Sequence, residues 1–220
     1  MPNRTIAIGD IHGCSAALEA LLEAIRPSPD DVVITLGDYI DRGPDSKGVL
    51  DRLIDLGRRC RLVPLLGNHD QVLLDVCSGK DPIDSLLDMG GAATLDSYGP
   101  GRSLDLIPDE HYEFLESCRL YHETETHIFV HANYDPDLPM AEQWVGTLLW
   151  ESLRAQTPGP HESGKTVVLG HSSQKNGEIL DLGHLICIDT FCYGNGWLTA
   201  LDVGTGEIWQ ADREGGMRRR

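Results

Sequence analysis

The first seventy residues repeat one rhythm three times, and this rhythm constrains the fold more than any other feature of the sequence. Each repeat starts with a short β-branched segment that ends in glycine followed by a polar residue. The strand-like segments are 5–8, 32–36 and 62–66, and segments with helical spacing of leucine and isoleucine lie between them at 15–25 and 49–56. Such alternation is typical of parallel strands joined by right-handed crossover helices. The sequence therefore predicts an α/β fold.

The rest of the chain continues this pattern after a middle section that is harder to interpret. The middle section contains helix-like segments at 83–87 and 110–117. Strand-like segments follow at 128–130, 166–169 and 185–188, and the last segment, 197–210, is a hairpin. No linker divides the chain, and its length suits one well-packed domain. We therefore expect a single domain over residues 1–220, in which the polar end, 211–220, forms a flexible tail.

The composition argues against several classes of partner. A formal net charge of −17 does not suit a nucleic-acid polymer, because phosphate backbones are bound by basic surfaces. No apolar run approaches the roughly 20 residues that a membrane span needs, and the N-terminal residues lack a signal-peptide core. Six cysteines without a Cys-x-x-Cys pair are typical of reduced thiols. We expect a cytoplasmic protein with no membrane partner, and the sequence leaves its oligomeric state open.

Side chains that can ligate metal ions follow five of the predicted strands. They are Asp10, His12, Asp38, Asn68, His131 and His171. Because the loops at the carboxyl ends of parallel strands converge on one crevice, we expect these side chains to meet. Each of them taken alone is more often a turn or surface residue. Six suitable residues at five strand ends, however, indicate a binding site.

The residue types indicate two transition-metal ions. A mixed set of oxygen and nitrogen ligands suits Mn, Fe or Zn better than it suits an all-oxygen calcium site or an all-sulfur structural zinc site. With two divalent ions, Asp10, Asp38, a bridging hydroxide and Arg42, the site would carry a net charge of about +2, which matches a phosphate monoester dianion. We therefore expect two-metal hydrolysis of phosphate monoesters, most simply with Mn²⁺ in vitro.

Three blocks of sequence carry a family resemblance. Gly9-Asp10-Ile11-His12-Gly13, the block from Gly37 to Gly43, and the block from Gly67 to Asp70 resemble the signature motifs of the phosphoprotein phosphatase family. This family belongs to the calcineurin-like metallophosphoesterases and includes bacterial and lambda-phage-type serine/threonine protein phosphatases. The resemblance implies a sandwich of two mixed sheets flanked by helices, with the metals at one edge.

The resemblance also implies a role for each matching residue. The first metal would be bound by Asp10, His12 and Asp38, and the second by Asp38, Asn68, His131 and His171. His69 would protonate the leaving group, Asp41 would orient His69, and Arg42 would bind the phosphate. A histidine can donate a proton near neutral pH, and a neighbouring carboxylate keeps it charged. Residue chemistry therefore agrees with the roles of His69 and Asp41.

One departure from the family pattern concerns phosphate binding. Relatives carry a second arginine in a Trp-x-Arg pattern, whereas this chain has Ser152 at the arginine position after Trp150. Two residues are candidates for the missing cation. Arg154 can reach the site only if its helix ends or kinks near Ser152, whereas Lys165 lies in the loop before the strand that delivers His171. We expect Lys165 rather than Arg154 to contribute, and the alternative is that both are solvated surface charges.

A second motif points to a different function. Residues 159–166 match the P-loop pattern Gly-x4-Gly-Lys-Thr. A P-loop needs a strand before it and a helix after it, so that backbone amides and the helix dipole meet the phosphates. Here a strand-like segment follows the motif instead. A nucleotide-binding P-loop is therefore a distant alternative, and a Pro/Gly-rich loop before a strand fits better.

The two remaining interpretations of the function differ in the substrate. Symmetrical bis(5'-nucleosyl)-tetraphosphate hydrolases resemble this chain in all blocks, but they tend to be longer and often lack an acidic residue at the position of Asp41. The presence of Asp41 and the short chain favour a serine/threonine-type protein phosphatase, in which a metal-bridging hydroxide attacks and His69 is the general acid. Its partner would be a phosphorylated protein or a small phosphoester. The tetraphosphate hydrolase is the alternative.

Overall fold

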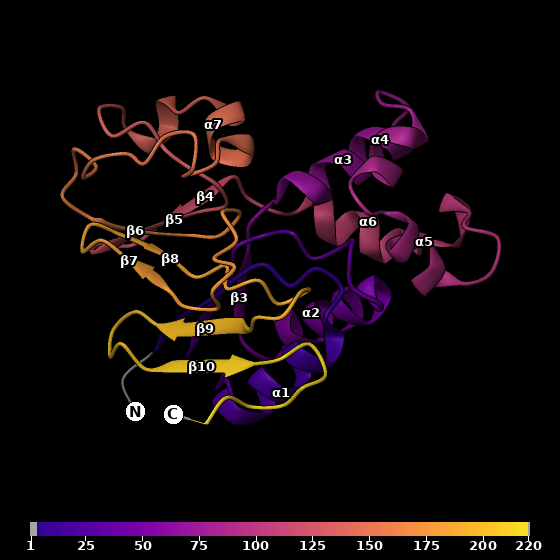
Figure 1. Cartoon of the computed structure of the whole chain (residues 1–220), viewed down its shortest axis with the longest axis horizontal. Helices are drawn as coiled ribbons and strands as arrows, with labels where there is room; N and C mark the ends of the chain where they lie inside the picture. Colours follow the sequence, from indigo (N-terminus) through magenta and orange to yellow (C-terminus); the bar gives the residue numbers. More distant parts are fainter. Residues whose placement is uncertain (1–3, 220) are drawn as a thin grey trace.

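The computed structural model describes residues 4–219, and its strands form two five-stranded sheets (Figure 1). The first sheet has the order β10 (Ile208–Ala211), β9 (Leu198–Asp202), β1 (Thr5–Ile8), β2 (Val32–Thr35), β3 (Arg61–Pro64). The second has the order β4 (Tyr121–Glu123), β5 (His127–Val130), β6 (Thr166–Leu169), β8 (Leu185–Cys187), β7 (Leu180–Asp181). The predicted α/β fold with two mixed sheets is confirmed.

The first sheet is parallel on one side and antiparallel on the other, whereas the second has a parallel centre and antiparallel edges. β1, β2 and β3 are parallel, as are β5, β6 and β8, while β9, β10, β4 and β7 pair in the antiparallel sense. Parallel strands of this kind need crossover connections, which in the first sheet are helices. The consequence for function is that the carboxyl ends of the central strands leave the sheets in one direction.

Alternating side chains explain why the two sheets pack face to face. Phe129 of β5 lies in the core between the sheets, whereas Ile128 and Val130 pack on the opposite face. In β1, Ala7 joins the same central core, and Ile6 and Ile8 pack in the cluster that contains the helices. These strands are apolar on both faces, as expected for sheets that are covered on both sides.

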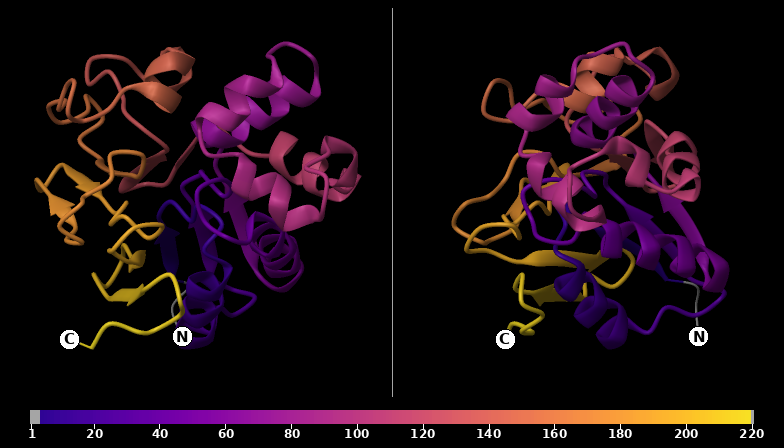
Figure 2. Two further views of the ribbon diagram at one scale, coloured as in Figure 1. Left: turned by 45° about the vertical axis from the view of Figure 1, so that its right-hand side comes forward. Right: turned by 90° about the vertical axis from the view of Figure 1, so that its right-hand side faces the viewer.

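Helices cover the outer face of the first sheet, and one short helix packs on the second. They are α1 (Ser15–Ile25), α2 (Ser46–Arg59), α3 (Asn68–Cys77), α4 (Ile83–Asp88), α5 (Ala92–Tyr98), α6 (Asp109–Glu116) and α7 (Val145–Trp150), with 3-10 turns at Leu104–Leu106 and Met140–Glu142. Figure 2 shows the helices of the first half of the chain on one side of the molecule and the strands of the second half on the other. The predicted helices near 83–87 and 110–117 correspond to α4 and α6.

The sequence did not indicate α5. This helix has only seven residues, and only Thr94 and Leu95 are buried in it, so it has no apolar stripe that periodicity could detect. Its contribution is a polar contact with the loop that follows β2, which is described below. The helix is therefore held in place by contacts distant in sequence rather than by its own pattern.

Two further expectations concern the whole chain. No helix among residues 4–219 is long and apolar enough to cross a membrane. Arg218 donates hydrogen bonds to Gln210 and to Glu178 near the end of the described chain. The single-domain organisation, the flexibility of 211–220 and the cytoplasmic location stay predictions.

A buried carboxylate ties the start of the first sheet to the loop before β2. Asp31 accepts hydrogen bonds from the backbone N–H of Arg4 at 3.1 Å, from the Arg4 guanidinium at 2.6 Å, and from the backbone N–H of Ser28 at 2.7 Å. The hydrogen bond from Arg4 is the main reason why the pKa of Asp31 is held well below its ordinary value. The contact fixes the point at which β1 enters the sheet.

We predict that Asp31→Asn lowers the free energy of unfolding by about 1 kcal/mol or more at pH 7, because charge-assisted hydrogen bonds are lost while partial exposure of Arg4 limits the effect. Since the folded-state pKa lies below the unfolded value of about 3.9, the stabilisation is complete above that pH and is lost as the pH falls further. Urea unfolding at pH 7 and pH 3 should show a smaller difference at pH 3. Asp30→Asn, at an exposed neighbouring position, is the control, and a difference that does not change with pH would contradict the role of the charge.

Candidate active site

The predicted metal ligands come together where the central strands of both sheets end. Asp10 and His12 follow β1, Asp38 follows β2, and Asn68 begins α3 directly after the loop that follows β3. His131 follows β5, and His171 follows β6. All six are buried except His171, which is partly exposed. The convergence expected from the strand-end pattern is therefore present in the structure.

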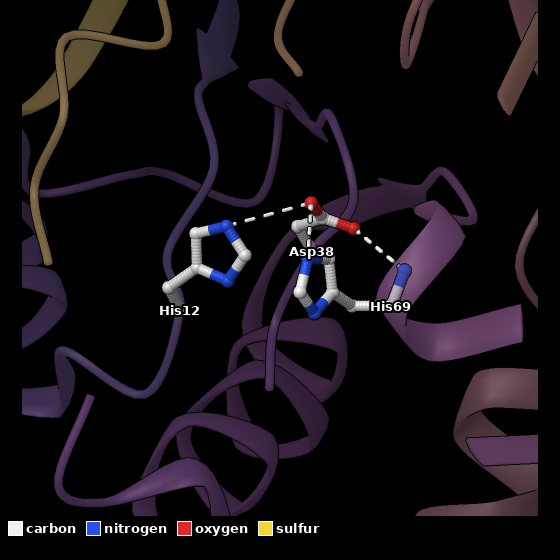
Figure 3. Close-up of side chains that lie close together, drawn as sticks. All are labelled: His12, Asp38 and His69. Atoms are coloured by element: carbon white, nitrogen blue, oxygen red, sulfur yellow. Dashed lines mark hydrogen bonds and ion pairs between the residues drawn. The ribbon is translucent and has the colours of Figure 1, made fainter. Parts of the chain in front are cut away.

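Asp38 lies at the centre of this cluster. Its Oδ2 is 3.5 Å from Nε2 of His12 and 3.9 Å from Nε2 of His69, and its Oδ1 is 3.5 Å from Nε2 of His131 (Figure 3 shows His12, Asp38 and His69). Two groups of possible ligands share it, His12–Asp38–His69 and Asp38–His131–His171, each with its ligand atoms within 4.8 Å of one another. A carboxylate shared by two ligand groups suits a two-metal site.

Hydrogen bonds to the backbone fix which ring nitrogen of two histidines faces the cluster. Nδ1 of His131 donates to the carbonyl of Leu36 at 2.7 Å, and Nδ1 of His12 donates to the carbonyl of Ile40 at 2.9 Å. In each neutral ring, Nε2 then carries a lone pair that points at the cluster. Both tautomers are therefore arranged for metal ligation.

Two acceptors in the cluster face each other without a proton between them, because the proton of His131 is on Nδ1. Nε2 of His131 lies 3.0 Å from Oδ1 of Asn68, and Nδ1 of His171 lies 3.1 Å from the same oxygen. Burial lowers the pKa of His12 to about 3 and that of His171 to about 4, so both rings are neutral at neutral pH and each keeps one nitrogen lone pair for a metal ion. Facing lone pairs in a buried site are stabilised by a cation, and this donor set fits a divalent transition metal.

Burial and charge act in opposite directions on the two aspartates. Burial works against the ionised form of Asp38, but the surrounding histidines hold its pKa below the ordinary value. Burial raises the pKa of Asp10, and the nearby carboxylates Asp189 and Asp38 raise it further. Oδ2 of Asp10 accepts a hydrogen bond from the backbone N–H of His171 at 2.9 Å, and Asp10 belongs to neither ligand group. Asp10 therefore lies at the edge of the cluster, not at its centre.

Strained backbone is concentrated at this site. Non-glycine residues with positive φ in the described chain are His12, Arg26, Asp38, Asp41, Arg42, Arg102, His171 and Phe191. Five of these are predicted site residues, and Phe191 lies in the loop beside the site. Arg26 and Arg102 lie elsewhere. Side chains held in this region cost of order 1 kcal/mol each and persist where surrounding contacts over-determine them. Most of the strained residues thus lie in the loops that form the candidate site.

His69 is oriented by a buried polar chain. Its Nδ1 lies 2.7 Å from Oδ2 of Asp41, and Oδ1 of Asp41 accepts a hydrogen bond from Thr94 of α5 at 2.6 Å. Burial raises the pKa of Asp41, although the hydrogen bonds from His69 and Thr94 oppose this effect. The Nδ1–H of His69 donates to Asp41, which leaves Nε2 directed toward the cluster. This arrangement suits a proton donor.

Arg42 lies beside the cluster, as the sequence predicts. Its Nη1 is 3.0 Å from Nε2 of His12, and its guanidinium carbon lies 4.6 Å from the ring centroid of Tyr193. Since Nε2 of His12 carries a lone pair, it accepts this hydrogen bond. Arg42 is thus a solvent-accessible cation in contact with a candidate metal ligand, where it can meet an anionic group.

The structure does not bring Lys165 to the site. Lys165 precedes β6, whereas His171 follows it, so the length of the strand separates the two, and Nζ of Lys165 pairs with Glu123 at 2.8 Å. The proximity to His171 that favoured Lys165 is therefore a proximity in sequence only. β6, rather than a helix, follows residues 159–166, so the P-loop alternative lacks the context that its chemistry needs.

Arg154 is closer to the site than Lys165. α7 ends at Trp150, which meets the condition under which Arg154 can approach, and the Arg154 guanidinium donates to the backbone carbonyl of Ser173, two residues after His171. Ser152 lies 3.2 Å from Ser172 through their hydroxyl oxygens. Arg154 is therefore beside the loop that carries His171, although it is exposed.

Asp189 is a buried residue of the site that the sequence interpretation missed. It follows β8, so the same strand-end pattern that identified the other residues applies to it. Its Oδ2 accepts from Ser173 at 2.6 Å and its Oδ1 accepts from the backbone N–H of Phe191 at 3.1 Å. Tyr193, which packs 4.8 Å from the ring of His12, was missed as well, and no local pattern marks it.

Comparisons with known proteins agree with this geometry. Residues 4–200 match the calcineurin-like phosphoesterase family. A symmetrical bis(5'-nucleosyl)-tetraphosphatase from Acidovorax sp. (strain JS42) is 52% identical over 73 residues, 33% of this chain and 25% of that protein. Curated relatives of this name are matched over only about a quarter to two fifths of their own length.

Solved structures extend the similarity over nearly the whole chain. A structure provisionally described as a diadenosine tetraphosphatase has a TM-score of 0.72 and 26% identity, covering 95% of this chain and 93% of that one. A cold-active protein-tyrosine phosphatase from a Shewanella species has a TM-score of 0.65, with 16% identity over 98% of this chain and 80% of that one. The latter similarity shows the fold alone.

These findings overturn the predicted protein-phosphatase function in favour of its alternative. Two arguments were wrong. Asp41 orients His69, a task that does not depend on the chemical nature of the leaving group, so its presence does not distinguish the substrates. The short chain does not distinguish them either, because this chain and the structure provisionally described as a diadenosine tetraphosphatase cover nearly all of each other.

We predict that Mn²⁺ stabilises the wild-type protein and that Asn68→Leu removes this effect, because the amide oxygen lies between the two histidine nitrogens. A ligand that binds only the folded state at 100 times its Kd adds about 2.7 kcal/mol of stability. Thermal unfolding with and without Mn²⁺, together with elemental analysis, measures the effect. Asn176→Leu, in an exposed loop, is the control, and an equal Mn²⁺ shift in both variants would contradict the site.

Proposed function

Since the chain belongs to the calcineurin-like phosphoesterase family, we propose that it hydrolyses dinucleoside tetraphosphates symmetrically, giving two nucleoside diphosphates. The observation that carries the proposal is the pair of ligand groups that share Asp38, because a shared carboxylate suits two-metal phosphoryl transfer. The name of the relatives supports this substrate class over others. A small phosphoester, not a polymer, is then the partner.

Six side chains would hold the two metal ions. Asp10, His12 and Asp38 would hold one ion, and the ligands of the other would be Asp38, Asn68, His131 and His171. When bound, two divalent ions would supply the positive charge that activates a water and polarises the phosphoryl group. Mn²⁺ is our choice for assays in vitro, and Fe or Zn would also suit this mixed set of ligands.

The remaining residues would act on the phosphate chain and on protons. Arg42 would bind a non-bridging phosphate oxygen, because it is an exposed guanidinium in contact with His12. Water would add to an inner phosphorus, the bond to the central bridging oxygen would break, and His69 would give a proton to the departing diphosphate. Asp41 and Thr94 would keep Nε2 of His69 directed at that oxygen. Arg154 is a second candidate for phosphate binding.

We predict that the Mn²⁺-loaded enzyme converts diadenosine tetraphosphate to ADP alone. Product analysis by anion-exchange chromatography distinguishes this from asymmetric cleavage, which gives ATP and AMP. Chelation should abolish the activity and Mn²⁺ should restore it, because the ligand cluster has no other source of positive charge at its centre. Equal activity in metal-free enzyme, verified by elemental analysis, would refute the two-metal proposal.

We predict a leaving-group dependence for His69→Asn. If His69 is the general acid, the variant should hydrolyse phenyl phosphate about 10²–10⁴-fold more slowly than the wild type, because phenolate is a poor leaving group. p-Nitrophenyl phosphate and diadenosine tetraphosphate, whose leaving groups are less basic, should lose less. The control is His127→Asn, which changes a partly exposed histidine of β5. Equal losses on all three substrates would mean that His69 does not protonate the leaving group.

A further inference from the structure

Hydrogen bonds of Asp189 hold the loop after β8 against the candidate active site. Asp189 accepts hydrogen bonds from Ser173 and from the backbone N–H of Phe191, and its carbonyl accepts from the backbone N–H of Gln174 at 2.8 Å. Ser173 and Gln174 belong to the loop that carries His171. The segment 191–193 is thus fixed relative to a candidate metal ligand.

Phe191 adopts a backbone conformation that its side chain disfavours. Its φ is +67°, in the left-handed region where glycine is free of strain. A glycine would satisfy this turn, so the turn itself does not explain the phenyl ring. The ring is partly exposed, and Gly194 packs against it closely enough that a Cβ at that position would clash.

Two ring contacts connect Phe191 to the metal-ligand cluster. The centroids of Phe191 and Tyr193 are 4.7 Å apart, and those of Tyr193 and His12 are 4.8 Å apart, both edge-to-face. Tyr193 is also partly exposed. An aromatic surface therefore extends from a candidate metal ligand toward solvent.

Two cations accompany this surface. The Arg42 guanidinium lies over Tyr193, and Nζ of Lys175 lies 6.0 Å from the ring centroid of Phe191, at the outer limit of a cation–π contact. Ten of the seventeen lysines and arginines within residues 4–219 pair with carboxylates, but neither Arg42 nor Lys175 does. Cations without a carboxylate partner beside partly exposed rings are unusual in a chain whose net charge is −17.

Aromatic faces and unpaired cations beside a phosphoryl site match the parts of a nucleotide. A base stacks on an aromatic ring, and this contact tolerates any base because every base has a π-face. The cations bind phosphate oxygens. A phosphate without a nucleoside would use the cations but not the rings.

We propose that Phe191 and Lys175 form a nucleoside subsite, in which the base stacks on Phe191 while Lys175 and Arg42 bind the phosphates between the base and the metal cluster. Tyr193 is a positioning residue that keeps Arg42 directed along this path. The proposal rests on the proposed function, because it names the residues that recognise the nucleoside half of the same substrate. Lys175 makes only a distant contact with the Phe191 ring, so a planar base can take its place there.

The test compares binding of ADP with binding of inorganic diphosphate by calorimetry on the Mn²⁺-loaded protein. These ligands differ by the nucleoside, so the ratio of their Kd values isolates the subsite. The wild type should prefer ADP about tenfold, the size of one base–aromatic stack, and Phe191→Gly should reduce this preference to about twofold or less. Phe191→Gly also relieves the positive φ, so it should fold. Phe191→Tyr, which retains a ring, should keep most of the preference.

Lys175→Ala should weaken the binding of both ligands by severalfold, whereas Lys80→Ala, which changes an exposed lysine remote in sequence, should weaken neither. Equal affinity of the wild type for ADP and diphosphate, or an equal loss for both ligands in Phe191→Gly, would overturn the subsite.

ADP formation from diadenosine tetraphosphate is measured in parallel. If it fails while the ring-dependent preference persists, the proposed function is wrong and the subsite stands; if it succeeds while the preference is independent of Phe191, the subsite is wrong.

Discussion

The Asp38 carboxylate is the point on which the rest of this structure depends. It is almost completely buried. Its Oδ2 lies 3.5 Å from Nε2 of His12, which follows a strand of the first sheet, and its Oδ1 lies 3.5 Å from Nε2 of His131, which follows a strand of the second. It also accepts a hydrogen bond from the backbone N–H of His69 at 3.1 Å, which aligns the start of α3. One carboxylate thus connects both halves of the sandwich. The apolar core between the sheets brings them together, but the contacts of Asp38 determine how their loops meet.

Such a cluster opposes the stability of the metal-free fold. An acceptor of His131 faces an acceptor of Asn68, His12 and His171 remain neutral, and several loop residues keep a left-handed backbone. Each of these costs free energy that must be offset by the surrounding core. The glycine backbone packs so closely against the site that Asp10 and Asp38 have little room to move. A Cβ on Gly67 would overlap Asp38, and one on Gly170 would overlap Asp10. The site is therefore preorganised by the scaffold, and cation binding would remove the main source of repulsion.

The protein-phosphatase interpretation failed for a reason that applies more widely. It took a residue that serves the chemistry, Asp41, as a sign of the substrate. Its contacts are with His69 and Thr94, so it orients His69, the proton donor of the proposed mechanism. Substrate choice depends on what lies outside the reacting atoms, and there this chain has Ser152 in place of an arginine and an aromatic segment at Phe191 and Tyr193. These positions, not the shared motifs, are where members of one family can differ.

The sequence by itself determined the parts of this protein that depend on local backbone geometry. Strand periodicity identified the central strands, and the polar residue after each strand identified the candidate ligands; the same pattern would also have identified Asp189. Only the tertiary structure decided which distant residues meet. Lys165 is six residues from His171 in sequence, yet β6 separates them and Lys165 pairs with Glu123, whereas Thr94 reaches Asp41 from a helix without an apolar stripe. The physical reason is that strand ends are marked by short-range patterns, while the partner of a side chain depends on strand order and loop course, which bring together residues with no local pattern in common.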